Sequence, residues 1–435
     1  MSMNIDNFKD LVLLVGTNPL PNFVVAEFFL KKNENIEKIW LIHSEKNENY
    51  FQAGTLECAK NLEKIITDRW KDKHKKLQFP LEKNPLSDVS NASKITANIK
   101  NMITELKENK SFHFNYTGGT KSMSTHSYWN LERIGEDVKK SFSYLDGRNF
   151  RLILDYPDEV IADDLRQEVN ITFKELIELH GFERRNEDGT NLFANTLEIF
   201  TNLIESDRLG EFYEDNGGYN RKLFENDKGE LAEKGQLKSN KKKKEKIDEL
   251  KPNKIFQDII DSMPEEYRIF DNNGAFKWGL AKNNFKKTLK YIDGEWLEGY
   301  IAKILEDEFC NNTGITFNND WEIKKPDWPG DAYFQLDVIM VHGYQLTGIS
   351  CTTAKKKSLC KSKGFEIIHR TKQIGGDEAK AVLIAFMDAK TRDAVQRELL
   401  YDTGVTQGNI CVLGINDLKK DKLIKKIKKF IFDKD

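Results

Sequence analysis

The sequence is poor in the residues that build disulfide frameworks and zinc sites. Its 435 residues include only five cysteines and seven histidines, and they contain no CxxC pair and no HExxH pattern. A disulfide scaffold or a structural zinc site is therefore not expected, and this cysteine usage favours a reducing cytoplasm. Any metal ion is expected to be a hard cation held by carboxylates, such as Mg²⁺ or Mn²⁺.

Long apolar runs and an excess of one charge are also missing. No run approaches the roughly 20 apolar residues of a membrane-spanning helix, so no membrane association is expected. The N-terminus lacks the pattern of a secretory signal. The 68 Lys and Arg residues nearly balance 70 Asp and Glu residues, which excludes a generally basic coat but permits a local basic groove. A hydrophobic content of 39% is sufficient for real cores, and the length favours about two or three domains.

Residues 1–157 alternate short apolar runs with amphipathic stretches. Such alternation is typical of βαβ units with a mostly parallel sheet, so we expect a Rossmann-like α/β domain. Strands are predicted at 11–15, 36–42, 77–81, 112–116, 139–144 and 150–156, with helices between them.

The sharpest local signal is NYTGGTKSM, at residues 115–123, which follows a predicted strand and opens a predicted helix. Its two glycines allow a tight turn, and the helix N-terminus attracts an anion such as phosphate. A second loop, GTNPLPN at 16–22, leaves the first strand, and both loops are expected at the carboxyl edge of the sheet. A simple turn is the alternative interpretation. The candidate ligand-binding residues are Gly16, Thr17, Asn18, Asn22, Ser44, Asn115, Thr117, Gly118, Gly119, Thr120 and Lys121.

The remaining chain is predicted to contain a connecting segment and a second α/β domain. Residues 158–290 are expected to be helical or irregular, and their lysine run KSNKKKKEK is interpreted as a solvated linker or, alternatively, a nucleic-acid contact. Residues 291–435 show an amphipathic helix, two strands joined by a tight turn, a helix from about residue 362, and a further buried strand.

Two acids in this last region are candidate metal ligands. Asp337 lies inside an apolar strand, where an unpaired charge is costly, and Glu298 projects from the helix that begins the domain. Together they could hold a divalent cation that activates water and neutralises a phosphodiester. A structural role for the two acids is the alternative.

The strand after Asp337 reads Ser350-Cys351-Thr352, so the acid-x-lysine pair that often completes such sites is missing. The following helix instead offers Lys363 and Glu366, three residues apart and therefore on one face. We expect Glu298, Asp337, Lys363 and Glu366 to be catalytic, with Glu298, Asp337 and Glu366 as metal ligands. An exposed helical ion pair is the alternative for Lys363 and Glu366, and the lysines at 355–357 are rivals for the cationic role.

Two literal motif matches are interpreted as surface charge. Glu322 and Lys324 form an ExK, and Pro326 with Asp327 forms a PD dipeptide. Both precede the Asp337 strand, so their order is wrong for the carboxylate site described above.

The loops NYTGGTKSM and GTNPLPN together resemble the ligand loops of CRISPR-associated Rossmann-fold (CARF) domains. The segments GEWLEGY, QLDV and GISC resemble the signature of the restriction-endonuclease-like, PD-(D/E)xK nuclease fused to such domains. This resemblance implies a type III CRISPR accessory effector. A CARF homodimer would bind a cyclic oligoadenylate, with cyclic tetra-adenylate favoured, and activate metal-dependent cleavage of DNA or RNA.

The sequence departs from that signature at three positions. Gln335 replaces a glutamate of the family, and Ser350 and Thr352 replace the acid and the lysine of the following strand. Either Glu366 and Lys363 have taken over these roles, which we favour, or the nuclease is weakened. The alternative function is therefore a ligand-sensing protein that binds nucleic acid or a partner without cleaving it. The hydroxyls of Thr17 and Thr120 also leave open slow cleavage of the ring ligand.

Overall fold

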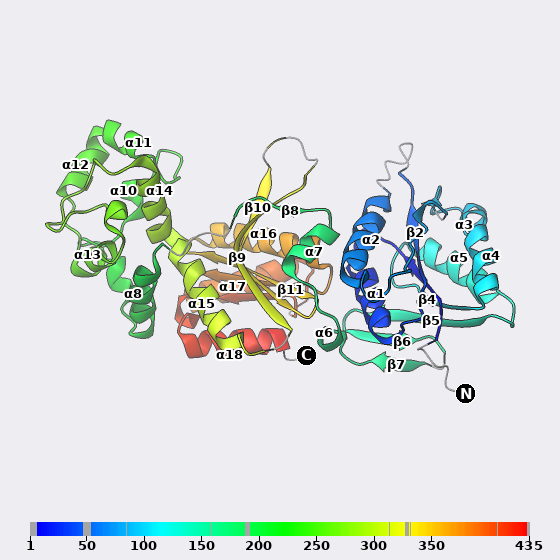
Figure 1. Cartoon of the computed structure of the whole chain (residues 1–435). Coiled ribbons are helices and arrows are strands. Elements are labelled where there is room, and N and C mark those ends of the chain that lie inside the picture. The colour runs from blue at the N-terminus through cyan, green and yellow to red at the C-terminus, as the bar shows by residue number, and fades with distance from the viewer. Residues whose placement is uncertain are drawn as a thin grey trace.

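The computed structural model describes residues 7–46, 54–83, 85–156, 158–187, 192–312, 314–326, 330, 332–406 and 408–432. Figure 1 shows an elongated molecule with an N-terminal sheet at one end, a helical subdomain at the other, and a second sheet between them. Within the described ranges, no helix has the length and apolarity needed to cross a membrane.

The N-terminal sheet has seven strands in the order β3-β2-β1-β4-β5-β6-β7. The first five run parallel, and β6 and β7 are antiparallel additions at one edge, so the predicted Rossmann-like α/β class is confirmed. The strands are β1 (Asp10–Leu14), β2 (Lys38–Ser44), β3 (Pro85–Leu86), β4 (Ser111–Asn115), β5 (Lys139–Asp146), β6 (Arg151–Leu154) and β7 (Glu159–Ala162).

Helices cover both faces of this sheet. Leu11 and Leu13 of β1 pack in the core with α1 (Leu20–Lys32) and α2 (Leu56–Trp70). Val12 and Leu14 pack on the other face with α3 (Ala92–Asn98), α4 (Lys100–Asn109) and α5 (Lys121–Glu132). Burial on both faces explains why β1 reads as a continuous apolar run.

Two details differ from the expectations for this domain. The strand predicted at 77–81 is wrong: only a single bridge at Gln78 forms there, and a 3₁₀ turn at Leu81–Lys83 follows. Pro80 has no backbone N–H to extend a ladder, and the strand pairing resumes at β3. The sheet also continues past residue 157, because β7 pairs with β6.

A short connection leads from the first sheet into the second. It contains α6 (Leu165–Glu168), α7 (Phe173–Leu179) and β8 (Glu183–Arg184), and β8 joins the edge of the second sheet by pairing with β9.

The helical subdomain follows, over residues 192–290. Its lysine run is helical rather than a linker, because the Asn240 side chain accepts a hydrogen bond from the Lys243 N–H and caps α12. The helices are α8 (Ala194–Glu205), α9 (Leu209–Phe212), α10 (Arg221–Phe224), α11 (Lys234–Ser239), α12 (Lys241–Glu249), α13 (Lys254–Asp261) and α14 (Lys282–Lys290), with a 3₁₀ turn at Glu265–Tyr267.

The second sheet has the order β13-β12-β11-β10-β9-β8. Helices α16 and α17 pack on one face, and α15 and α18 on the other. A π-helical turn, Tyr291–Glu295, joins α14 to α15, and a 3₁₀ turn, Ile415–Asp417, precedes α18. The elements are α15 (Trp296–Phe309), β9 (Ile315–Lys324), β10 (Tyr333–His342), β11 (Gln345–Thr352), α16 (Lys357–Gly375), β12 (Lys380–Ala385), α17 (Ala389–Thr403), β13 (Ile410–Leu413) and α18 (Lys420–Phe432).

One hydrophobic core joins the two sheet domains. Its buried members include Leu13 of the first sheet, Phe173 of the connection, and Trp321 and Leu346 of the second sheet. Phe173 and Trp321 make an edge-to-face contact, with ring centroids 5.1 Å apart. The two domains therefore share apolar packing.

Candidate functional site

Two loops meet at the centre of the N-terminal sheet. β1 and β4 are neighbours, and the helices that follow them, α1 and α5, cover opposite faces, which makes this the switch point of the sheet. Ligands of open α/β sheets bind at the carboxyl ends of strands at such a point. The two loops touch, since a Cβ on Gly16 would lie 3.1 Å from the backbone nitrogen of Gly119.

The second loop requires both of its glycines. Gly119 has a φ of 74°, and a Cβ on Gly118 would lie 1.9 Å from the carbonyl oxygen of Leu14. Thr120 then caps α5, because its hydroxyl accepts a hydrogen bond of 3.2 Å from the Met123 N–H. Lys121 is exposed at the first position of this helix, and it forms no ion pair with the described residues.

Three of the predicted ligand residues are buried beneath the loops and do not face solvent. Asn22, Ser44 and Asn115 are buried. The Asn115 amide donates to Ser143 Oγ at 2.9 Å, and the Asn22 amide donates to the Leu14 carbonyl at 2.8 Å. Asn22 Oδ1 is buried and has no partner among the described residues. The accessible positions are Gly16, Thr17, Asn18, Thr117, Gly118, Gly119, Thr120 and Lys121.

These loops lie in the part of the chain for which a known family was found. Residues 11–172 match the Card1 CARF domain family. The matched stretch, called the CARF region below, contains both loops, and it includes β7, which lies beyond residue 157.

Two solved structures resemble the chain over almost its whole length. Can2 from Sulfobacillus thermosulfidooxidans, solved with cyclic tetra-adenylate, is 15% identical with a TM-score of 0.60, covering 96% of this chain and 98% of Can2. Protein VC1899 from Vibrio cholerae is 14% identical with a TM-score of 0.66, covering 97% and 98%. At this identity the likeness establishes the fold. No curated protein matches the sequence.

The first loop of the CARF region contacts the connection and the C-terminal domain. Asn18 Oδ1 lies 3.1 Å from Nε2 of His180, which follows α7. Burial lowers the pKa of His180 to about 4. The amide nitrogen of Asn18 also lies against the end of α16, since a Cβ on Gly376 would be 2.4 Å away from it.

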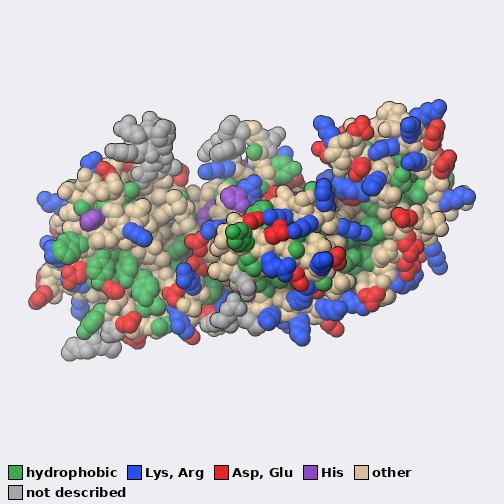
Figure 2. Space-filling model, turned by 180° about the vertical axis from the view of Figure 1, so that it is seen from behind, with side chains coloured by type: hydrophobic (Ala, Val, Ile, Leu, Met, Phe, Trp, Pro, Cys, Tyr) green, Lys and Arg blue, Asp and Glu red, His purple; other side chains and the backbone are tan. Residues whose placement is uncertain are grey.

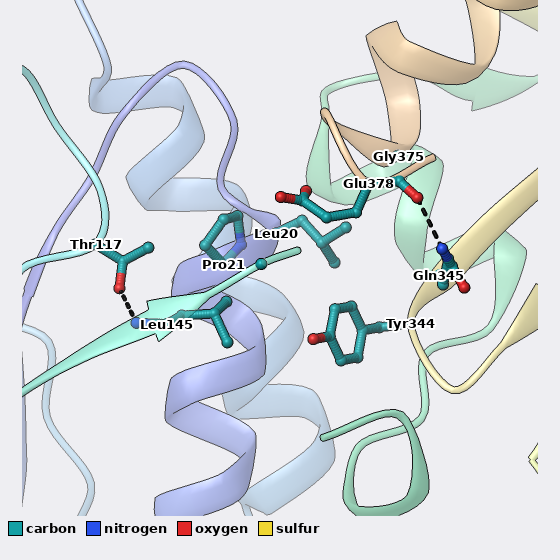
Figure 3. Close-up of a pocket in the computed structure, with 9 residues that line it drawn as sticks. Leu20, Pro21, Thr117, Leu145, Tyr344, Gln345, Gly375 and Glu378 are labelled. Atoms are coloured by element: carbon teal, nitrogen blue, oxygen red, sulfur yellow. Dashed lines mark hydrogen bonds between the residues drawn. The ribbon is translucent and has the colours of Figure 1, made fainter. Parts of the chain in front are cut away.

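The second loop borders a cavity of about 60 Å³ between the two sheet domains (Figure 3). Tyr344, in the turn between β10 and β11, points its buried hydroxyl into this cavity, where it has no partner among the described residues. Burial also raises the pKa of Glu378. The lining residues are Leu20, Pro21, Thr117, Leu145, Gly147, Tyr344, Gln345, Gly375 and Glu378.

In the C-terminal domain, α15 and β10 bring Glu298 and Asp337 together. Both side chains are half-buried. Burial and then the Asp337 charge raise the pKa of Glu298 well above its usual range, and burial also raises the pKa of Asp337. Asp337 Oδ2 accepts hydrogen bonds from the Cys351 N–H at 2.7 Å and from Ser350 Oγ at 3.2 Å. Strand β11, which carries Ser350 and Cys351, therefore orients Asp337 and does not itself supply an acid.

Two further acids near this pair were missed by the sequence reasoning. Asp320 lies opposite Asp337 between the register pairs Leu336–Trp321 and Val338–Asn319, and its φ is 51°. The side-chain amide of Gln335 donates a hydrogen bond of 2.7 Å to Asp320 Oδ1. Glu295 precedes α15, and its charge raises the pKa of Glu298. Neither acid belongs to a recognisable motif. Strand register brings Asp320 close to Asp337, and the helical turn before α15 brings Glu295 close to Glu298.

Lys363 and Glu366 lie on α16, within electrostatic reach of Asp337. The Lys363 charge lowers the pKa of Asp337, and the Glu366 charge raises it. The two form an ion pair of 3.1 Å with about half of each side chain exposed (51% and 46%). The pair is therefore both near the acids and open to solvent.

The two literal motif matches lie in surface ion pairs or outside the described residues. Glu322 pairs with Arg185 at 2.9 Å, and Lys324 pairs with Glu183 at 3.1 Å. Asp327 lies outside the described residues.

The acids meet the requirements of a hard cation that also binds substrate phosphate. No group of three or more His, Cys, Asp or Glu residues in the described part of the chain is arranged to hold a metal ion. Mg²⁺, however, is usually held by one or two carboxylates, several waters and substrate phosphates. Glu298 and Asp337 supply two oxygen donors, and burial, with the Asp337 charge added for Glu298, raises their pKa values and makes the ionised forms costly without a cation.

Proposed function

We propose that the protein is a type III CRISPR effector in which a cyclic oligoadenylate bound to the CARF region activates a metal-dependent nuclease. The observation that carries the nuclease part is the half-buried Glu298–Asp337 pair, because burial and then the neighbouring negative charge make its ionised form costly without a cation. We assign residues 1–172 to activator binding and residues 291–435 to the nuclease.

The activator contacts are proposed at the exposed parts of the two loops. Backbone N–H groups around Gly118 and Gly119 and the ammonium of Lys121 suit ring phosphates. The likeness to Can2, solved with cyclic tetra-adenylate, supports a ring of that size. Asn22, Ser44 and Asn115 are proposed to hold the loops in shape.

A homodimer is proposed because a ring with two-fold symmetry fits two copies of one surface. The CARF region carries exposed apolar side chains that a second copy could cover. Trp129 is 56% exposed, Tyr156 is 88% exposed, and Val160 is 46% exposed.

In the nuclease, Glu298 and Asp337 would hold Mn²⁺ or Mg²⁺, with Glu366 available as a further ligand. When bound, the cation lowers the pKa of water and neutralises phosphate charge. Asp337 is kept in place by the Cys351 N–H and Ser350. Lys363 is proposed to stabilise the charge that develops on the phosphodiester during cleavage.

The direct test incubates labelled single-stranded DNA, RNA and plasmid with Mn²⁺, with and without cyclic tetra-adenylate. Cleavage is expected only with both. The Asp337→Ala variant should lose cleavage and keep activator binding, whereas Lys121→Ala should lose activator binding. If no substrate is cut under any combination, the nuclease proposal is wrong.

A second candidate function is ligand-controlled binding without cleavage. It is favoured by one observation, that Ser350 and Thr352 stand where an acid and a lysine would be expected. In that case, cyclic tetra-adenylate should promote retention of DNA in a gel shift, with no products after long incubation.

A further inference from the structure

Lysines from several elements surround the acids of the C-terminal domain. Lys290, at the end of α14, pairs with Glu295 at 3.6 Å. Burial raises the pKa values of Glu295 and Asp320, and the Lys290 charge offsets part of that rise. Burial likewise raises the pKa values of Glu298 and Asp337, and the charge of Lys363 on α16 offsets part of it. Lysines of two different helices are therefore within electrostatic reach of the acids.

The loop before α16 adds two more exposed lysines, Lys355 and Lys356. Thr353 Oγ1 donates to the Asp293 carbonyl at 2.7 Å, which holds this loop against the turn that precedes α15. Lys355 Nζ lies 5.7 Å from the centre of the Tyr213 ring, which belongs to the helical subdomain. The loop is thus fixed between the subdomain and the acids.

Helix α14 extends this basic surface away from the acids. Phe285, Thr288 and Leu289 bury one face of the helix. Lys286, Lys287 and Lys290 are exposed on the other side. Residues three and four apart share a face, so Lys290 continues the surface of the other two over about 6 Å. Lys290 pairs with Glu295 at 3.6 Å, whereas Lys286 and Lys287 form no ion pair with the described residues.

The lysine run of α12 lies elsewhere. Figure 1 places α12 at the far end of the helical subdomain, whereas α14 leads directly to α15. Lys243 donates to the Glu225 carbonyl, and Lys244 bonds Asp248 at 2.5 Å. Figure 2 shows Lys and Arg side chains over the helical subdomain and at its junction with the C-terminal domain, interspersed with Asp and Glu.

We infer that α14 and the 353–356 loop form a docking surface for the phosphate backbone of a nucleic-acid strand leading to the acids. This inference rests on the proposed function, because that function supplies the substrate class. The chain as a whole has a net charge of only −2, so attraction of a phosphate backbone depends on local lysines. The surface offers charge without base-specific donors, and it is expected to bind strands of any sequence.

The test measures binding of a fluorescent 30-nucleotide single-stranded DNA in the presence of cyclic tetra-adenylate, at several salt concentrations. All proteins carry Asp337→Asn so that the DNA is not cut. The test variant is Lys286→Ala/Lys287→Ala/Lys290→Ala. The control is Lys241→Ala/Lys242→Ala/Lys246→Ala on α12, which removes the same charge from the same subdomain.

The α14 variant is expected to bind about tenfold or more weakly at 0.1 M salt. The slope of log affinity against log salt should become less steep by about 2. Each phosphate contact to a single strand contributes about 0.7 to the slope, and three contacts are lost. The α12 control should change neither quantity. Equal losses in both variants, an unchanged α14 variant, or no DNA binding by the parent protein would overturn the inference.

Cleavage by the proteins with Asp337 intact separates this inference from the proposed function. If the wild-type protein cleaves DNA and the α14 variant cleaves it with an unchanged KM, only the docking surface is wrong. If the wild-type protein neither binds nor cleaves any nucleic acid, the proposed function fails as well. Unchanged circular dichroism and activator affinity in the α14 variant confirm that it is folded.

Discussion

Asn18 Oδ1 lies 3.1 Å from Nε2 of His180, and this contact joins the first ligand loop to the chain that enters the second sheet. Four residues after His180, Arg184 lies in β8 opposite Ile323 of β9. The Arg184 charge lowers the pKa of Asp320, which lies across from Asp337. One hydrogen bond, a short stretch of chain and the field of Arg184 therefore connect the loop at 16–22 to the acids.

The first prediction concerns this link. We expect His180→Ala to bind cyclic tetra-adenylate with nearly unchanged affinity but to show about tenfold less activated cleavage, since a hydrogen bond to a buried polar group contributes about 1–1.5 kcal/mol. The measurement is cleavage rate against activator concentration. His369→Ala, at an exposed position of α16, is the control. Unchanged activated cleavage, or a loss of activator affinity as large as the loss of cleavage, would contradict the link.

The second prediction tests the glycine turn. Gly118→Ala places a Cβ 1.9 Å from the Leu14 carbonyl, so the loop must move. We expect at least about a tenfold loss of activator affinity and a fall of roughly 1–3 kcal/mol in the free energy of unfolding. Calorimetric titration and urea denaturation measure the two effects. Gly210→Ala is the control, because a Cβ there meets nothing within 4 Å.

The third prediction concerns the charge of the acid pair. Folding raises the pKa of Asp337, so its ionised form costs stability at pH values above the folded pKa. Without metal at neutral pH, Asp337→Asn should therefore raise Tm, while it should abolish cleavage. Adding Mn²⁺ should raise the Tm of the wild-type protein and leave that of the variant unchanged. A lower Tm for the metal-free variant would contradict the cost of burying the ionised Asp337.

The raised pKa values of Glu298 and Asp337 also determine how cleavage should depend on pH. Glu298 and Asp337 hold their protons to a higher pH than ordinary carboxyl groups, and only their ionised forms bind a cation. As pH falls, cleavage should be lost above the usual carboxyl range near pH 4. A higher Mn²⁺ concentration should move this loss to lower pH. A pH profile that does not respond to metal concentration would show that these carboxyls do not limit metal binding.

The fourth prediction separates two lysines on one helix. The charge of Lys363 stabilises the ionised form of Asp337. Lys361, in contrast, pairs with Glu398 at 3.1 Å and with Asp402 at 2.7 Å. We expect Lys363→Ala to lower kcat by roughly 100-fold, as loss of a group that stabilises transition-state charge does. Lys361→Ala should leave kcat within about twofold. Similar kcat values for both variants would remove Lys363 from the catalytic set.

The parts of the fold that follow local pattern could be predicted from the sequence. The continuous apolar run of β1 and the NYTGGTKSM turn depend on neighbouring residues, and the structure places both at the switch point. The strand at 77–81 could not be predicted correctly, because Pro80 interrupts pairing at a position whose hydrophobicity still suits a strand.

The contacts that complete the site depend on tertiary structure. Asp320 reaches Asp337 through strand register, and His180 reaches Asn18 across 162 residues of chain. The lysine run of α12 gives the strongest compositional signal for nucleic acid, yet it is α14 that leads to α15, the helix that carries Glu298. Composition identifies charge but not its position in the fold.

The apolar packing between Leu13, Phe173, Trp321 and Leu346 bears on how this protein can be dissected. A fragment that ends after the CARF region would leave its side of that packing in water, and a fragment of the C-terminal domain would do the same. Such halves should aggregate or bind hydrophobic dyes, and the two sheet domains should melt in a single cooperative transition. Function is therefore better separated by point substitution than by truncation.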